Sequence, residues 1–446
     1  MATYKNVKAS NYDENFKAIF KFPKSKIAVP GIIVDEIVNI ETVGSNEKEK
    51  VVKCQIVKES SIRTKPKCII GNKCGGCTLQ HIKYDEQLKL KTNMVQKLFD
   101  ENISTKVKVQ PTIGMKNPYN YRNKSQIVYK YQNGKMISGF YEEGTHNVID
   151  FDDCHLQDVE CNKIAKTIKD LMTKMRISAY DEDKRKGIIR HVLIKSSYTT
   201  KEILVVLIVG TENFPGRNNF VKALIAKHKN ISSIVQNLND RKTSAVLGDK
   251  ETILYGKGFI TDSLLDKKFK ITSKSFYQIN HEQTEILYKN AITLANIKPT
   301  DTVLDAYCGV GTIGILASSN AKKVIGVELV KDAVDNAIYN AKMNNIKNIS
   351  FFNQDATNFI VNMTRKKESL DVLIMDPPRS GSTKEFLDAT IKLSPKSIVY
   401  VSCNPYTLVN DLKCLINDYE IRAVQTVDMF PHTSHVESIV LLTKKN

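Results

Sequence analysis

The sequence lacks any apolar run long enough to cross a membrane. The longest strongly apolar run, Ile203 to Val209, has seven residues, whereas a membrane-spanning helix takes about 20. The first twenty residues also lack the apolar segment that a secretory signal requires. We therefore expect no membrane partner and a cytoplasmic location.

Extremes of composition are missing as well. The 446 residues are 41% hydrophobic and 26% charged, which is ordinary for a globular protein. This balance excludes a collagen-like fibre, a long disordered tail and a small disulfide scaffold. A chain of this length is expected to form about two to four domains.

Arginine is scarce, with only ten of the 66 basic residues, yet lysine gives the chain a net charge of +18. The net charge is +4 over residues 1–65, +13 over residues 66–270 and +1 over residues 271–446. A basic surface favours a polyanion because binding releases counterions. Codon bias toward lysine would give the same excess, so charge alone does not decide whether the partner is a nucleic acid.

The first two regions are predicted to be rich in strands. Short alternating runs in residues 1–65, with a turn at Pro30–Gly31, predict a small β-barrel of the oligonucleotide-binding kind. Residues 66–270 begin with a cysteine-rich loop and a helix from Tyr84 to about Leu98. A β-rich segment follows, with a hairpin at Asn133–Gly134.

The pattern changes from about residue 271. Five apolar strands alternate with helical stretches in residues 271–446, which predicts a doubly wound parallel sheet of the α/β class. The last two strand candidates are joined by a loop too short for a helical crossover. We therefore expect them to pair antiparallel.

A glycine-rich turn follows the first of these strands. In DAYCGVGT, Gly309 and Gly311 allow a tight turn and the close approach of a ligand. Glu328 ends the next strand, where it can accept hydrogen bonds from ribose hydroxyls, and Asp355 follows the third, near an adenine edge. Together they favour S-adenosylmethionine over NAD, whose enzymes show a fuller G-x-G-x-x-G, and over a turn that binds no ligand.

Two further strand ends carry reactive groups. DPPRSG ends the fourth strand, and its prolines would hold Asp376 in a rigid loop; Arg379 replaces the aromatic residue usual in methylases of exocyclic amines. Cys403 ends the fifth strand and Glu437 precedes the last, so they are a candidate nucleophile and base. The alternatives are a turn without ligand, a buried inert thiol and a solvated loop acid.

Nine cysteines in a cytosolic chain of this size point to metal or catalysis rather than disulfides. Cys68, Cys74 and Cys77 are spaced closely enough for a metal loop, with two glycines between the last two. A fourth thiolate is needed, for which we favour Cys154 over Cys161. Both zinc and an iron–sulfur cluster accept four thiolates.

The ordered motifs resemble those of the RNA (uracil-5-)-methyltransferases, in particular the iron–sulfur branch that acts on 23S ribosomal RNA. The resemblance covers most of the chain and rests on CGGCTLQHIKYDEQLKLK, NYRNKSQIVY, GFYEEGTHNVID, IIRHVLIK, QNLNDRKTSAVLG, SFYQIN, DAYCGVG, DPPRSG, VSCNP and HTSHVE. Residues 1–65 resemble a TRAM-type barrel only loosely.

The resemblance implies a Rossmann-like S-adenosylmethionine-dependent methyltransferase domain over residues 271–446, joined to a β-rich central domain. It implies that Cys403 is the nucleophile and Glu437 the general base. It also implies contacts to cofactor and target base from Gln278, Tyr307, Glu328 and Asp376. A [4Fe-4S] cluster would be held by Cys68, Cys74, Cys77 and Cys154.

The implied chemistry is the addition of the Cys403 thiolate to C6 of a uridine, which activates C5 for methylation. A lowered pKa of Cys403 is therefore expected. We expect a monomer whose partner is RNA, in particular 23S rRNA, since relatives that modify tRNA generally lack the cluster cysteines. The alternatives are a tRNA uracil-5-methyltransferase, an RNA 5-methylcytosine enzyme and an RNA-binding assembly factor without activity.

Overall fold

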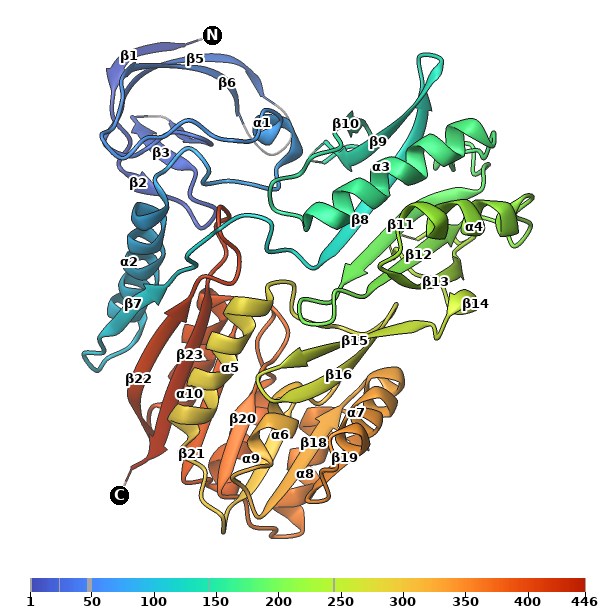
Figure 1. Cartoon of the computed structure of the whole chain (residues 1–446). Coiled ribbons are helices and arrows are strands. Elements are labelled where there is room, and N and C mark those ends of the chain that lie inside the picture. Colours follow the sequence, from blue (N-terminus) through green and yellow to red (C-terminus); the bar gives the residue numbers. More distant parts are fainter. Residues whose placement is uncertain (1, 24, 46–49, 143, 244, 446) are drawn as a thin grey trace.

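The computed structural model describes residues 2–23, 25–45, 50–142, 144–243 and 245–445, and Figure 1 shows that they form three lobes. The lobe at the N-terminus and the strand-rich lobe beside it lie above a larger lobe that contains the C-terminus. Among the described residues, no helix is both long and apolar enough to cross a membrane.

The N-terminal lobe consists of two small antiparallel sheets around one apolar core. Each has three strands: β1 (Thr3–Val7), β5 (Ile37–Ser45) and β6 (Lys50–Lys58) in one, and β2 (Asn11–Tyr12), β3 (Ala18–Phe22) and β4 (Ser25–Val29) in the other. Small β-structure is therefore confirmed here, although the described strands pair as two sheets rather than as one closed barrel.

The central lobe is a seven-stranded sheet in the order β10-β9-β8-β11-β12-β13-β14. Its strands are β8 (Lys124–Gln132), β9 (Lys135–Tyr141), β10 (Val148–Asp150), β11 (Ile189–Ser196), β12 (Ile203–Val209), β13 (Ile231–Leu238) and β14 (Lys250–Gly256). The predicted hairpin is confirmed, because Asn133 and Gly134 both have positive φ, at 51° and 78°, as a two-residue turn of this kind requires.

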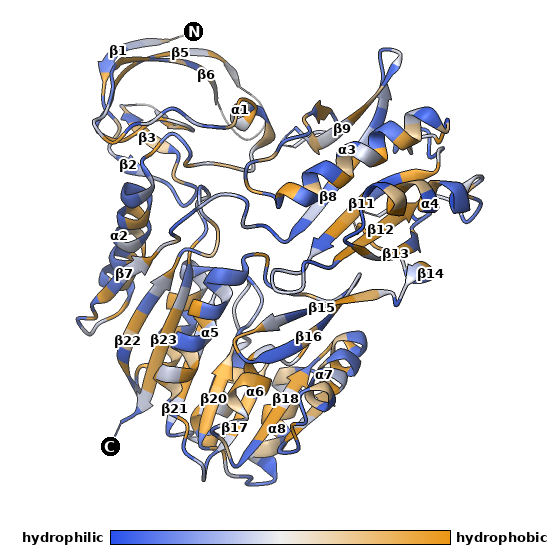
Figure 2. Ribbon diagram, viewed as in Figure 1, coloured by the Kyte–Doolittle hydropathy of each residue, from blue (hydrophilic) through white to orange (hydrophobic). Residues whose placement is uncertain are grey.

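Both faces of this sheet are covered. Helices α3 (Val159–Lys174) and α4 (Arg217–Lys227) pack on one face. On the other face, Leu193 and Leu204 join a core shared with the C-terminal lobe through the hairpin β15 (Phe259–Leu264) and β16 (Lys267–Thr272). Burial on both faces explains why β12, with the sequence ILVVLIV, is the most continuously apolar strand of the lobe (Figure 2).

The C-terminal lobe contains an eight-stranded sheet in the order β19-β18-β17-β20-β21-β23-β22-β7. Its strands are β7 (Val109–Ile113), β17 (Thr302–Ala306), β18 (Lys323–Glu328), β19 (Ile349–Asn353), β20 (Val372–Met375), β21 (Ser397–Ser402), β22 (Tyr419–Val427) and β23 (Glu437–Lys444). The five strands from β17 to β21 are parallel, and β22 and β23 pair antiparallel. The predicted α/β sheet and the antiparallel pairing at its end are confirmed.

Helices cover both faces of this sheet. One apolar core joins it to α5 (His281–Ala295), α6 (Thr312–Ala317) and α7 (Lys331–Met343), and a second joins it to α2 (Tyr84–Asn102), α8 (Ala356–Arg365), α9 (Lys384–Leu393) and α10 (Pro405–Leu415). Strand β17 lies between β18 and β20, so the strand order reverses there. Ligands of doubly wound sheets bind at the carboxyl ends of the strands at such a point.

Strand β7 and helix α2 come from the segment that the sequence assigns to the central region, yet they pack on the C-terminal lobe. Val109 and Gln110 pair in parallel with Val424 and Gln425 of β22, and α2 packs on β7. The pairing covers the hydrogen-bonding groups of β22, which would otherwise form an open sheet edge. Local sequence pattern predicts such a strand but not its partner.

Candidate active site

The predicted reactive residues meet at the carboxyl edge of the C-terminal sheet. Tyr307, Asp376 and Cys403 directly follow β17, β20 and β21, and Glu328 ends β18. Because these strands are parallel, their ends share one edge. The structure therefore brings together at one edge side chains that lie far apart in the sequence.

Glu437 lies at the same edge of the sheet, although its strand runs in the opposite direction. Strand β23 runs antiparallel to β21, and Ser438 pairs with Ser402. Cys403 directly follows Ser402, and Glu437 directly precedes Ser438, so both lie at this end of the strand pair. They are close enough for Glu437 to raise the pKa of the Cys403 thiol, after the larger effect of burial.

The turn after β17 has the conformation that its glycines were predicted to allow. Gly309 and Gly311 have φ of 55° and 81°, and a Cβ on Gly311 would lie 2.8 Å from the Phe351 ring. The Glu328 carboxylate accepts hydrogen bonds from the backbone N–H of Gly309 at 3.1 Å and of Val330 at 2.8 Å. Its remaining lone pairs can accept further donors, such as ribose hydroxyls.

Tyr307 and Asp355 border this turn. Tyr307 has a left-handed backbone, with φ of 65°, which is uncommon for a residue with a side chain and is often found at functional sites. Its hydroxyl lies 3.2 Å from Ser382 Oγ. Asp355 caps α8 by accepting from the N–H of Asn358, and its charge is one of the causes that raise the pKa of Tyr307.

An excess of carboxyl groups lies beneath this edge. Burial raises the pKa of Asp305 to about 8, of Asp376 to about 7 and of Glu437 to about 8. Buried Tyr288 of α5 is influenced by all three and hydrogen-bonds with Gln278, which is thereby placed at this site. Such a group of enclosed acids favours a positively charged ligand, so the residues present fit a sulfonium cofactor with a ribose.

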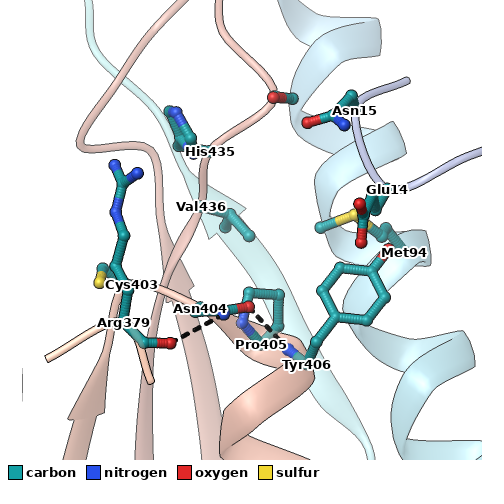
Figure 3. A pocket seen from close by; sticks show the side chains of 11 residues that line it. Glu14, Asn15, Met94, Arg379, Cys403, Asn404, Pro405, Tyr406, His435 and Val436 are labelled. Atoms are coloured by element: carbon teal, nitrogen blue, oxygen red, sulfur yellow. Dashed lines mark hydrogen bonds between the residues drawn. The ribbon is translucent and has the colours of Figure 1, made fainter. Parts of the chain in front are cut away.

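Cys403 opens into a cavity of about 170 Å³ (Figure 3). Burial, followed by the charges of Glu437 and Asp376, raises the pKa of its thiol to about 11, whereas Arg379 lowers it. The expectation of a lowered Cys403 pKa is therefore wrong for the free protein, because the neighbouring acids and the loss of water outweigh one exposed guanidinium. Arg379 also lowers the pKa of Glu437.

Some of the residues that line this cavity were not predicted from the sequence. Glu14 and Asn15 come from the N-terminal lobe and Met94 from α2, and Figure 3 shows them opposite Cys403 and Arg379. The turn that carries Glu14 and Asn15 is held by Phe16, which is buried in an apolar cluster with residues of the cysteine-rich loop. No local pattern shows that this turn reaches the cavity, because its position depends on packing between lobes.

The loop that leads to Glu437 is held by α2. Buried Lys91 forms an ion pair of 2.5 Å with buried Asp428, whose other oxygen accepts from the Tyr84 hydroxyl at 2.8 Å. The Gln87 side chain accepts from the backbone N–H of His432 and lies 3.2 Å from His432 Nδ1. These contacts fix the loop on both sides of Pro431.

The four predicted metal ligands are close enough to affect one another. Cys154 and Cys68 raise the pKa of Cys77, which burial already raises to about 12, and Cys74 raises the pKa of Cys154. Among the described residues, however, no three His, Cys, Asp or Glu side chains are arranged to hold a single metal ion. Thiolates around one zinc ion lie roughly 3.8 Å apart, given Zn–S bonds of about 2.3 Å, whereas a cluster with an iron at each corner separates them further.

Arg122 supplies positive charge to the cysteine group. The charges of Cys77 and Cys154 are among the causes that raise the pKa of Arg122. Within the described part of the chain, no carboxylate lies within ion-pair distance of the Arg122 guanidinium. Its buried Nε has no hydrogen-bond partner there. A cluster with four thiolates carries negative charge and would accept from it, so these residues fit such a group. Cys161, the rival ligand, instead lies on α3 with its side chain buried in the core of the central lobe.

Comparison with known proteins shows to which family the chain belongs. The family described as tRNA (Uracil-5-)-methyltransferase matches residues 83–445. An uncharacterized RNA methyltransferase of Halalkalibacterium halodurans is 40% identical over 415 residues, which are 90% of this chain and 91% of that protein. Another from Clostridium tetani is 40% identical over 429 residues, or 96% of this chain and 93% of that protein.

A solved structure agrees over nearly the whole chain. The tRNA (uracil-54, C5)-methyltransferase of Pyrococcus abyssi, in complex with S-adenosyl-L-homocysteine, superposes with a TM-score of 0.79 at 26% identity. The match covers 98% of this chain and 100% of that chain. The extent of these matches and the catalytic sheet agree with the ordered motifs: the chain belongs to the RNA (uracil-5-)-methyltransferase family and is an enzyme of that class.

Proposed function

We propose that this enzyme methylates C5 of a uridine in 23S rRNA, with Cys403 as nucleophile and Glu437 as general base. The observation that carries the proposal is that Cys403 lines a cavity while buried Glu437 lies close enough to raise the pKa of its thiol. The rRNA target is supported by the four neighbouring cysteines, since related tRNA enzymes generally lack them. tRNA is the second candidate, because the Pyrococcus abyssi protein acts on uridine 54 of tRNA.

Cys403 and Glu437 divide the reaction into addition and elimination. Cys403 Sγ bonds to C6 of the uracil, and the electron pair of the C5–C6 double bond makes C5 nucleophilic. After C5 has gained the methyl group, Glu437 removes its remaining proton. The electron pair of that C–H bond restores the double bond and expels the thiolate. Asp376 or Gln278 would hydrogen-bond the uracil edge and stabilise the enolate charge.

The cofactor would be held by the residues around the glycine turn. Glu328 would accept from the ribose, Asp355 would lie at the adenine, and Tyr307, Gln278 and Asp376 would border the reacting end. When bound, S-adenosylmethionine supplies the methyl group on a positively charged sulfonium. The enclosed carboxyls favour that charge, which explains why the fold tolerates acids with raised pKa values there.

The direct test is incubation with labelled S-adenosylmethionine and unmodified transcripts of 23S rRNA or tRNA, followed by nucleoside analysis. We expect 5-methyluridine in rRNA and no 5-methylcytosine. Cys403→Ala should abolish methylation and any covalent RNA adduct, because the thiolate that is proposed to bond to C6 is removed. Cys414→Ala, a partly exposed cysteine on α10, is the matched control and should retain activity. Full turnover by Cys403→Ala would remove Cys403 as the nucleophile, and methylation of tRNA alone would replace the rRNA proposal.

Glu437→Gln should trap the reaction after methyl transfer. Without a base the C5 proton remains, so Cys403 stays bonded to RNA and a denaturation-resistant protein–RNA species accumulates on a denaturing gel. Glu420→Gln, at an exposed position on β22, is the control and should release its product normally. Rapid release by Glu437→Gln would contradict the base role.

The rate should depend steeply on pH. Glu437, with a pKa of about 8, and Cys403, with a pKa of about 11, must both lose protons. Therefore kcat/KM of the free enzyme should rise steeply up to about pH 8 and more gently from there toward about pH 11. Arg379 lowers both pKa values, and Arg379→Gln should therefore move this profile to higher pH. If both pKa values move by about one unit, the rate at neutral pH should fall about a hundredfold, about tenfold for each group.

Arg379→Lys keeps the charge and is expected to keep most of the profile. If Arg379→Gln loses activity by the same factor at every pH, the arginine binds substrate and does not lower the pKa of the Cys403 thiol.

The cysteine group should hold a [4Fe-4S] cluster with Cys68, Cys74, Cys77 and Cys154 as ligands. Protein purified without oxygen should be brown and contain about four iron atoms per chain. Cys154→Ser should lower the iron content, whereas Cys161→Ser, in the core of the central lobe, should leave it unchanged. Colourless protein loaded with zinc would overturn the assignment.

A further inference from the structure

A second cavity lies where the central and C-terminal lobes meet. It also measures about 170 Å³, the same volume as the cavity over Cys403. Its walls come from the segment between β7 and β8, which crosses between the lobes in Figure 1, and from the ends of β11 and α5. We call it the Tyr119–Tyr198 pocket after two of its lining residues, and none of the steps derived above uses it.

The two tyrosines give the pocket aromatic surface, and a lysine ammonium lies over each ring. Tyr198 is 46% exposed and stacks on His281 with ring centroids 4.3 Å apart. Lys201 Nζ lies 4.8 Å from the centroid of the Tyr198 ring, and Lys67 Nζ lies 3.9 Å from that of Tyr119. Aromatic rings beside cations are the usual means of binding single-stranded RNA, because bases stack on the rings while phosphates meet the cations.

The polar groups of the pocket indicate which base edge it accepts. Asp158 and Glu282 line it, and each already accepts a side-chain hydrogen bond, from Ser196 at 3.2 Å and from Tyr198 at 2.9 Å. Carboxylate oxygens have lone pairs for further donors and repel phosphate. They would accept from the exocyclic amino group of adenine, cytosine or guanine. Uracil has no such group, and its one donor on that edge, N3–H, lies between two carbonyl oxygens that carboxylates repel.

The pocket is joined by hydrogen bonds to the elements of the catalytic site. Tyr121 donates to the carbonyl of Pro431 at 3.1 Å, and Asn280 donates to the carbonyl of Met429 at 3.0 Å. Both carbonyls belong to the loop that leads to Glu437, and Tyr121 and Asn280 both line the pocket. The pocket therefore adjoins the loop that leads to Glu437.

We propose that the Tyr119–Tyr198 pocket binds a second base of the RNA, one that carries an exocyclic amino group and is not itself methylated. The proposal rests on the proposed function only in that the ligand is RNA. It makes this pocket a determinant of which uridine is chosen, since sequence in RNA is read from unstacked bases held on aromatic rings.

The test measures binding of labelled single-stranded 12-mers of adenosine, cytidine or uridine at one fixed salt concentration, by fluorescence anisotropy. The wild type should bind the adenosine and cytidine oligomers more tightly than the uridine oligomer. Tyr198→Ala should weaken binding between about 5-fold and 150-fold, the effect of losing one stacked base. Tyr198→Phe keeps the ring and should bind like the wild type. Glu282→Gln should reduce the preference over uridine.

Tyr131→Ala is the matched control, because Tyr131 is a 66% exposed tyrosine on β8 that is not among the residues lining the pocket. It should bind like the wild type. Equal affinities of Tyr198→Ala and Tyr131→Ala would overturn the proposal, as would equal binding of all three oligomers by the wild type. If Tyr198→Ala does not fold, ultraviolet crosslinking of the wild type tests the proposal instead. The adenosine oligomer should be crosslinked to the peptides that contain Tyr119 or Tyr198. Crosslinks found only in other peptides would contradict the proposal.

The proposed methylation reaction and the proposed binding of a second base can be refuted independently of each other. Crosslinks at Tyr198 without formation of 5-methyluridine would refute only the reaction. Formation of 5-methyluridine by an enzyme whose RNA affinity does not depend on Tyr198 would refute only the second base.

Discussion

The register between β21 and β23 is the constraint on which the catalytic site depends. Ser402 and Ser438 pair across these strands, and the next positions are Cys403 and Glu437. Side chains alternate faces along a strand, so a slip of one residue would turn one of the two groups to the other face of the sheet. The strong burial of β21 and β23 resists such a slip, and the hydrophobic core thereby fixes a catalytic geometry.

Helix α2 completes the site from outside the catalytic domain predicted by the sequence. The Lys91–Asp428 pair and the contacts of Gln87 with His432 hold the loop that precedes Glu437. Removing one partner of a buried ion pair costs about 3–5 kcal/mol because the other charge remains buried. The backbone N–H of Leu79 donates to the His432 carbonyl at 3.0 Å, so the cysteine-rich loop also meets this loop. A cluster there would stabilise the same contact without taking part in methyl transfer.

The acidic side chains enclosed at the catalytic site favour a positively charged ligand. Asp305, Asp376 and Glu437 all have raised pKa values. The folded state therefore holds protons there that the unfolded state releases at lower pH, and the stability that these groups provide decreases as pH rises. A cationic cofactor offsets this cost. Burial, followed by the charges of Glu437 and Asp376, raises the pKa of Cys403, and Arg379 is the charge that opposes them.

The sequence by itself determined the α/β sheet, the strand ends that carry Tyr307, Glu328, Asp376 and Cys403, and the family. These features follow from hydrophobic period and from short motifs, which depend only on neighbouring residues. Only the tertiary structure decided that Glu14 lines the cavity over Cys403 and that β7 closes the sheet edge. It also showed that the Cys403 pKa is raised rather than lowered. Each of these depends on contacts between residues far apart in the chain, because burial and long-range charge are set by packing and leave no trace in local sequence.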